Sequence, residues 1–460
     1  MPLETKESFV KRLSSLTRIL SSSLALGAIV LATRAVAGAK DIVLSRTFGT
    51  SQELDAFLLA FGIVSFIGAA IANASTSTLV PALSRARSDA EPEAEARLIV
   101  VATGAAVLLC AVTTSTAILF KAQLSHWVAP GLDADRAIAV QRLLVVLFPV
   151  PVLATFQSII ASTLNTRYGF RGAAAITVLT PICVTTTLFL RLHPNAGDLA
   201  LATMLGMLLE TLSLIVLARW RKITLTARVP WTYARRSVAG LARDFAPLVA
   251  GTVLGSTSPL VDQAFATMAG PGGVSTLNYS NRLTALAVGI GSASVGLIVL
   301  PHFSEIAARE AWQEMKTLLH RLATSTFLLA ALATLGIALL SGPLLRLIFQ
   351  HGQFTARDTT TAAPIQALYA LQIPFHLTGI VAVRALNAMR RNRTIMVVVV
   401  WNVVSNVAGD YVFMKVFGLR GVALSTSTTY IVSCFALLTF AHSELKRRIT
   451  STATLIAGKR

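Results

Sequence analysis

The chain contains repeated apolar segments that are each long enough to cross a bilayer as an α-helix. A membrane-spanning helix needs about 20 mostly apolar residues, because it rises 1.5 Å per residue through a hydrocarbon core about 30 Å thick. Of the 460 residues, 54% are hydrophobic and only 13% are charged, whereas about a quarter of the residues in a soluble domain are charged. The sequence therefore predicts an all-α integral membrane protein. The expected transmembrane helices, about twelve in number, lie at 20–45, 53–82, 98–121, 138–164, 170–192, 198–218, 245–269, 277–301, 320–343, 362–389, 394–416 and 420–443.

The basic residues are concentrated on one side of these segments. The formal net charge is +19, but the lysines and arginines are not collected into one domain that could bind nucleic acid, so we expect no nucleic-acid partner. Clusters such as 85–87, 219–236, 390–393 and 446–448 lie in alternate loops, and the opposite loops hold far fewer basic residues. Because basic loops stay in the cytoplasm, both termini are predicted to be cytoplasmic.

Short motifs recur between the two halves of the chain at a nearly constant offset. Pro81 in LVPALSRAR corresponds to Pro301 in VLPHFSEIAAR, and three further matches follow in the same order: Gly131 with Gly352, Leu164-Asn165 with Leu386-Asn387, and LAT at 201–203 with LST at 424–426. This order predicts duplication of a six-helix unit. Because six is an even number, both copies would have the same orientation in the membrane. We therefore expect parallel repeats that form two lobes around a central cavity. The predicted divisions are an N-terminal lobe at 1–218, a basic cytoplasmic linker at 219–243, a C-terminal lobe at 244–445 and a basic cytoplasmic tail at 446–460.

Charged residues interrupt several apolar segments. Arg34, Lys40 and Asp41 lie in the first segment, Asp55 begins the second, and Arg282 lies in 277–301. A charge near the centre of a membrane helix costs about 2.5–3.5 kcal/mol on insertion scales. One interpretation is that these charges pair to fix helix packing. The other is that they line a water-filled cavity, where arginine suits bidentate binding of phosphate or pyrophosphate.

A second group of polar residues offers only oxygen ligands. Asp262, Asn406, Asp410 and Thr426 lie in three apolar segments of the second half, and Asn406 and Asp410 share a helix face. The backbone carbonyl of Val422, one turn before Thr426, could join them. Oxygen ligands favour a hard cation over zinc or copper. An Asp–Asn hydrogen-bond network accounts for the spacing equally well.

No enzyme motif accompanies these residues. The sequence lacks a Walker loop, HExxH and GxSxG, so no ATPase or hydrolase site is expected. Transport would be driven by an ion gradient, the membrane potential or the gradient of the substrate itself.

Three stretches resemble a known family. TRAVAGAKDIVLSRTFGTSQELDAFLLAF, NYSNRLTALAVGI and LIFQHGQFTARDT are together similar to the MurJ/MviN lipid II flippases of the multidrug/oligosaccharidyl-lipid/polysaccharide exporter superfamily. The resemblance implies a flippase in the bacterial inner membrane that moves a polyprenyl-pyrophosphate-linked glycan by alternating access. Its substrate-binding positions would be Arg34, Lys40, Asp41, Asp55 and Arg282. Its sodium site would be Asp262, Asn406, Asp410, Val422 and Thr426, with Na⁺ as the coupling ion and no other cofactor. Its partners would be the lipid-linked glycan, membrane lipids and cell-wall or polysaccharide synthases.

The chain departs from the family pattern at a few positions. Gly68 and Asn73 lie near places where relatives usually carry an arginine and an acidic residue, a helix 1 arginine is Lys40, and the residue before Arg282 is Asn281. These changes leave open a second substrate, the lipid-linked unit of an exopolysaccharide or O-antigen. A drug antiporter of the same superfamily is a third interpretation, which the basic predicted cavity disfavours because cationic substrates need carboxylates.

Overall fold

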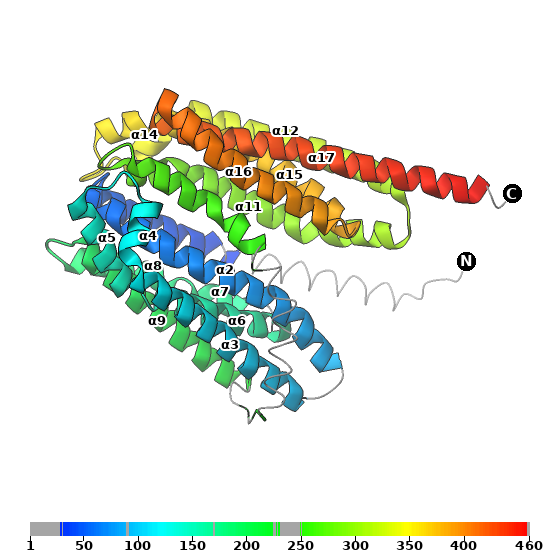
Figure 1. Ribbon diagram of the computed structural model, residues 1–460, viewed down its shortest axis with the longest axis horizontal. Helices are drawn as coiled ribbons and strands as arrows, with labels where there is room; N and C mark the ends of the chain where they lie inside the picture. Colours follow the sequence, from blue (N-terminus) through cyan, green and yellow to red (C-terminus); the bar gives the residue numbers. More distant parts are fainter. Residues whose placement is uncertain are drawn as a thin grey trace. The chain divides into compact units, whose positions relative to one another are not determined.

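The structure is a computed structural model that describes residues 28–29, 31–88, 92–168, 171–223, 227, 229–230, 249 and 251–457. Within these residues it is helical and contains no strand (Figure 1). Two helices occupy residues 31–48 and 251–267. The others are α2 (Gln52–Ser88), α3 (Pro92–Leu119), α4 (Lys121–Val128), α5 (Ala134–Val146), α6 (Val150–Tyr168), α7 (Arg171–Ile176), α8 (Leu179–Leu190), α9 (Ala196–Trp220), α11 (Gly273–Ala308), α12 (Trp312–Leu339), α13 (Ser341–Phe349), α14 (Ala356–Ala370), α15 (Gln372–Ala388), α16 (Asn392–Phe417) and α17 (Leu419–Ala457).

Ten of the predicted apolar segments coincide with helices that can cross a membrane. In the described residues nine helical spans are long and apolar enough, and the pair α5 and α6, bent by 42° at its break, makes a tenth. The remaining predicted segments are 20–45 and 245–269, and each includes residues that the structure does not describe. Most of their described residues belong to the helices 31–48 and 251–267. The all-α membrane fold is therefore confirmed. The count of twelve stays a prediction.

The order of helices repeats along the chain. Helices of the first half have counterparts that begin 220 to 223 residues later: α3 begins at Pro92 and α12 at Trp312, while α9 begins at Ala196 and α17 at Leu419. The repeated prolines lie inside long helices, Pro81 in α2 and Pro301 in α11. The helices thus extend the motif repeat over the length of both halves, as duplication of one unit requires.

The described residues group into two compact units that do not follow chain order. One unit comprises Met1–Leu44, Ile63–Phe120 and Arg142–Val249, and the other Ser45–Gly62, Lys121–Gln141 and Ala250–Arg460. Two segments from the first half thus pack within the second unit. Most of the predicted linker at 219–243 lies outside the described residues, and the predicted tail at 446–460 is continuous with α17 as far as Ala457. The predicted lobe boundaries stay a prediction.

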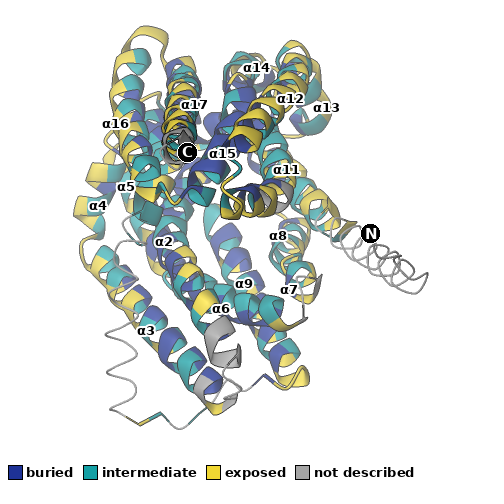
Figure 2. Cartoon of the chain, turned by 90° about the vertical axis from the view of Figure 1, so that its right-hand side faces the viewer, coloured by how far each residue is buried: buried dark blue, intermediate teal, exposed yellow. Residues whose placement is uncertain are grey.

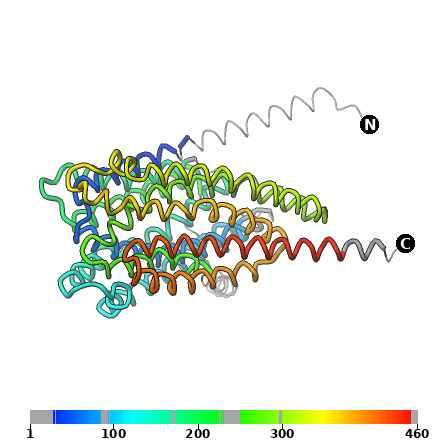
Figure 3. The backbone as a smooth tube through the Cα atoms, turned by 90° about the horizontal axis from the view of Figure 1, so that it is seen from above, coloured from blue at the N-terminus to red at the C-terminus, as the bar shows by residue number. Residues whose placement is uncertain are grey.

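Each unit has its own apolar core, and apolar side chains are also exposed. In the second unit α16 and α17 lie side by side (Figure 3), and a core cluster includes Phe303, Leu319 and Leu386. Figure 2 shows exposed residues along α12 and α16, where large apolar side chains such as Leu332 and Trp401 are more than half exposed. Exposed apolar surface of this extent is expected of helices that contact lipid.

Candidate functional site

The four predicted oxygen-bearing residues of the second unit form one buried cluster. The Asp262 carboxylate lies at its centre: Asn406 Nδ2 donates to Oδ1 at 3.1 Å, and Thr426 Oγ1 donates to Oδ2 at 2.9 Å. Asp410 lies one turn after Asn406 on α16 and is fully buried. The structure therefore brings together side chains from the helix 251–267, α16 and α17.

Several oxygens of this cluster are buried without a hydrogen-bond donor among the described residues. They are Asn406 Oδ1 and both carboxylate oxygens of Asp410. The Val422 carbonyl accepts from Thr426 Oγ1 at 3.1 Å and so lies at the same place. Buried carboxylate oxygens without donors need compensation by a proton or a cation. The donor set is all oxygen, as a hard cation requires. The described residues contain no group of three or more His, Cys, Asp or Glu side chains that could hold a metal ion, and this cluster has two carboxylates.

Close packing of α16 against α17 places the cluster. A Cβ on Gly409 would overlap Ser425 Oγ, and one on Gly421 would overlap the Phe413 carbonyl. Only glycine allows the two backbones to approach this closely. Ser425 Oγ then donates to the carbonyl of Asn406 at 3.2 Å, which fixes one helix against the other beside the carboxylates.

Two residues of this site were missed by the sequence analysis. Tyr369 of α14 donates its hydroxyl to Asp262 Oδ2 at 3.3 Å and is almost completely buried. Ser425 makes the backbone contact described above. Neither has a spacing that marks it in the sequence, because Tyr369 comes from a distant helix and Ser425 is one of several serines and threonines in STSTT at 425–429.

The charges of the first apolar segment are on the helix 31–48. Arg34 is exposed, and Lys40 Nζ lies 3.1 Å from Asp41 Oδ1. Asp41 is buried and Lys40 is a quarter exposed. Arg282 is half-buried on α11 in the other unit. The ion pair of Lys40 with Asp41 is thus established, and the prediction that Arg34, Lys40 and Arg282 share one cavity stays a prediction.

Asp55, the remaining predicted binding residue, lies at the first turn of α11. Its Oδ2 accepts from the backbone N–H of Gly272 and its Oδ1 from that of Ser275, both at 2.7 Å. Asp55 is 2% exposed. These contacts satisfy amides that have no partner within the helix, and they place a negative charge at the positive end of the helix dipole. Asp55 therefore holds α2 to α11 within the second unit.

The motif LIFQHGQFTARDT forms a second attachment within the same unit. Phe349 and Phe354 pack against the ring of Tyr279 at centroid distances of 5.2 Å. Asp358 is the capping partner of Thr355 at the start of α14 and accepts from Thr50 Oγ1 at 2.5 Å. Gly352 has φ of +61°, and a Cβ there would overlap the Arg46 carbonyl. These residues anchor the segment 46–50, which connects the helix 31–48 to α2, so this motif has a structural role.

Comparison with known proteins points to one family. A family model described as "Lipid II flippase MurJ" matches residues 44–457. The lipid II flippase MurJ of Burkholderia cenocepacia is 26% identical over 412 residues, covering 86% of this chain and 78% of that protein. The probable lipid II flippase MurJ of Thermotoga maritima is 24% identical over 405 residues, covering 87% and 80% respectively.

Solved structures show the same fold. One described as lipid II flippase MurJ in an inward closed conformation has a TM-score of 0.79 at 22% identity, covering 91% of this chain and 87% of that chain. An inward-facing MATE-family multidrug resistance transporter of the MOP superfamily has a TM-score of 0.75 at 15% identity, covering 91% and 95%. At these identities the structural matches show the fold alone. The family model matches most of the sequence and therefore shows the family. The chain belongs to the MurJ family.

Proposed function

We propose that the protein is a transporter, a flippase that moves lipid II from the inner to the outer leaflet of the bacterial cytoplasmic membrane. The observation that carries this proposal is the match of residues 44–457 to the lipid II flippase family. Lipid II consists of a glycan with a peptide, joined by pyrophosphate to a polyprenyl chain. A flippase for it must offer cations to the pyrophosphate within the membrane, and this chain carries Arg34 and Lys40 on its first described helix.

The basic residues would bind the pyrophosphate during transport. Arg34 and Arg282 can each form two parallel hydrogen bonds to phosphate oxygens, whereas Lys40 contributes a compact charge. Asp41 holds Lys40 at 3.1 Å and so limits where its ammonium can lie. Alternating access would carry the bound head group across while the polyprenyl chain stays in lipid.

The buried oxygen cluster would hold the coupling ion. Asp262, Asn406, Asp410 and Thr426, with the carbonyl of Val422, would bind Na⁺, whose single positive charge offsets one of the two buried carboxylates. Three helices contribute these oxygens, so ion binding favours whichever conformation brings the helices together. It can shift the conformational equilibrium only by the difference in affinity between the two states.

Topology and partners follow from the same proposal. Both termini and the basic loops would be in the cytoplasm, as the distribution of lysine and arginine predicts. Lipid II made on the cytoplasmic face would enter from that side, and cell-wall synthases that polymerise it outside would be the partners that consume it.

A second candidate substrate is another polyprenyl-pyrophosphate glycan. The packing of α2 around Gly68 supports this candidate. Gly68 lies near the place where members of the family usually carry an arginine, and a Cβ there would lie 3.0 Å from Pro151 Cα. An arginine side chain therefore has no room at this position without a shift of α6. At this position α2 therefore offers no cation to a pyrophosphate–sugar head group.

Translocation in reconstituted liposomes tests both candidates. Labelled lipid II and a labelled polyprenyl-pyrophosphate glycan without peptide would be compared with wild-type protein and with Arg34→Ala and Arg282→Ala. We expect lipid II to be moved by the wild type and by neither variant. Arginine variants that fold and still move lipid II would contradict the assigned binding residues, and preference for the other glycan would replace lipid II as the substrate.

A further inference from the structure

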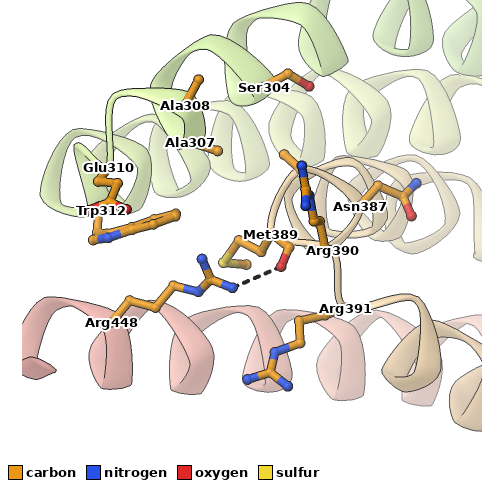
Figure 4. A pocket seen from close by; sticks show the side chains of 11 residues that line it. Ser304, Ala307, Ala308, Glu310, Trp312, Asn387, Met389, Arg390, Arg391 and Arg448 are labelled. Atoms are coloured by element: carbon orange, nitrogen blue, oxygen red, sulfur yellow. Dashed lines mark hydrogen bonds between the residues drawn. The ribbon is translucent and has the colours of Figure 1, made fainter.

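A pocket of about 670 Å³ lies at one end of the second unit (Figure 4). It is formed where α11 turns into α12 and where α15 turns into α16, with α17 as its third wall. Arg390, Arg391 and Arg448 line it together with Trp312 and Glu310. None of these residues belongs to the flippase site or the oxygen cluster proposed above.

The wall made by α17 is held in place by several contacts. Arg448 lies over the ring of Trp312 at 4.5 Å from its centroid and donates from Nη2 to the Met389 carbonyl at 2.9 Å. Its Nε donates to Glu444 Oε1 at 2.7 Å. A planar cation that is held on one face by an aromatic ring and at its edge by two hydrogen bonds loses little conformational entropy when an anion binds. The pocket is therefore organised before any ligand enters.

Positive charge at the pocket exceeds negative charge. Glu444 is the shared partner of Arg391, Arg447 and Arg448. Arg391 Nε is nonetheless buried without an acceptor among the described residues. Arg390 is exposed and has no ion pair within the described part of the chain. Three pocket-lining arginines, Arg390, Arg391 and Arg448, thus face two carboxylates, Glu444 and Glu310, and the exposed Arg390 is the cation that an anion can reach.

Backbone strain is concentrated in the same two turns. Glu310 has φ of +54° and Arg390 has φ of +60°, two of the three non-glycine residues with positive φ in the described chain. This region is costly for side chains with a Cβ, by about 1–3 kcal/mol, and such strain clusters at ligand-binding sites. Glycine or asparagine would remove it at the end of a helix. Arginine at 390 instead brings a cation to the pocket.

The pocket lies at the ends of membrane spans. The spans Gly273–Ala308 and Ala356–Ala388 end there, and Trp312–Leu339 and Asn392–Phe417 begin there. Val397 and Val400 on α16 are exposed beyond the turn, where they offer apolar surface to acyl chains. Basic pockets between helices at the cytoplasmic surface suit the phosphates of anionic lipids. We propose that this pocket binds the phosphodiester head group of an anionic phospholipid.

Lipid binding to the full-length protein tests the proposal without reference to transport. Native mass spectrometry would compare retention of phosphatidylglycerol with that of phosphatidylcholine. Arg390→Gln removes an exposed cation, Arg390→Lys keeps the charge, and Ala308→Phe fills the pocket without changing charge. The matched control is Arg393→Gln, an exposed arginine three residues away that does not line the pocket. Thermal unfolding verifies that each variant is folded.

We expect phosphatidylglycerol to be retained in preference to phosphatidylcholine. Its affinity should fall about fivefold in Arg390→Gln, the effect of one basic residue near an anionic surface. Ala308→Phe should weaken it as well, whereas Arg390→Lys and Arg393→Gln should leave it nearly unchanged. Equal losses in Arg390→Gln and Arg393→Gln would overturn the proposal, because the effect would then be that of general surface charge. Displacement of the lipid by equimolar inorganic phosphate would overturn it in favour of a free anion.

Discussion

Oδ1 of Asp55, in the first turn of α2, accepts a 2.7 Å hydrogen bond from the backbone N–H of Ser275, in the first turn of α11. Its other oxygen accepts from Gly272 at the same distance. A residue from the beginning of the chain thus serves as the capping side chain of a helix more than 200 residues later. This contact, with those of Arg46 and Thr50, ties the segment 45–62 into the second compact unit.

Asp55→Ala should lower the free energy of unfolding by about 1–2 kcal/mol, the cost of losing a helix-capping side chain. Asp55→Asn should cost less, because the amide oxygen can still accept one of the two bonds. Thermal unfolding of the purified protein measures both. Asp135→Asn is the control, since Asp135 is an exposed acidic residue in the first turn of α5. Equal stability of Asp55→Ala and the wild type would contradict the capping role.

Gly352→Ala should destabilise the protein by about 1–3 kcal/mol, the range for a residue forced into a strained backbone conformation. Two causes act together: φ is +61°, and the added methyl group would overlap the Arg46 carbonyl. Gly342→Ala provides the matched control, because no atom lies within 4 Å of its Cβ position and it is within α13. That variant should be neutral or slightly stabilising. The same melting temperature for both variants would show that the loop can rearrange.

Much of this fold is predictable from apolar length alone, and the exceptions have physical causes. Ten predicted segments became helices because an apolar stretch of about 20 residues can satisfy its backbone in lipid only as a helix. The short helices α4 and α13 follow the spans without their own long apolar stretch, so no segment was predicted for them. α17 continues past its apolar part because Glu444 pairs with Arg447 and Arg448 at i+3 and i+4, which stabilises a polar helix.

The candidate sites were predictable to different degrees. Asp262, Asn406, Asp410 and Thr426 could be grouped from residue type and the resemblance, and they do lie together. Asp55 was placed with the substrate residues through the family resemblance, and the structure shows hydrogen bonds from backbone amides, which no side-chain pattern reveals. Tyr369 escaped notice because a buried tyrosine is common in any core and only its contact with Asp262 distinguishes it.

Sodium should stabilise the wild-type protein against thermal unfolding more than potassium at equal ionic strength. A ligand that binds only the folded state adds about 2.7 kcal/mol when present at 100 times its Kd. Asp410→Asn should abolish the difference, since it removes a carboxylate whose oxygens have no donor among the described residues. Thr426→Val should reduce the difference between sodium and potassium, because one oxygen is lost. Thr428→Val, two residues along α17 and outside the cluster, should leave that difference unchanged. A sodium effect that survives in Asp410→Asn would place the ion elsewhere.

Lys40→Arg should preserve or increase the rate of lipid II translocation, and Lys40→Ala should reduce it about tenfold, as expected for the loss of one charge-assisted hydrogen bond. The lysine ammonium is a point charge that Asp41 partly neutralises at 3.1 Å. A guanidinium can keep that ion pair and still direct a second N–H toward a phosphate oxygen. Initial rates in liposomes, normalised to inserted protein, measure the change. Lys415→Ala is the control, because it also removes a lysine but lies outside the proposed substrate-binding residues: Lys415 is near the end of α16, with its Nζ over the ring of Tyr411. Full activity in Lys40→Ala would remove this residue from the substrate site and leave its ion pair with Asp41 as a packing contact.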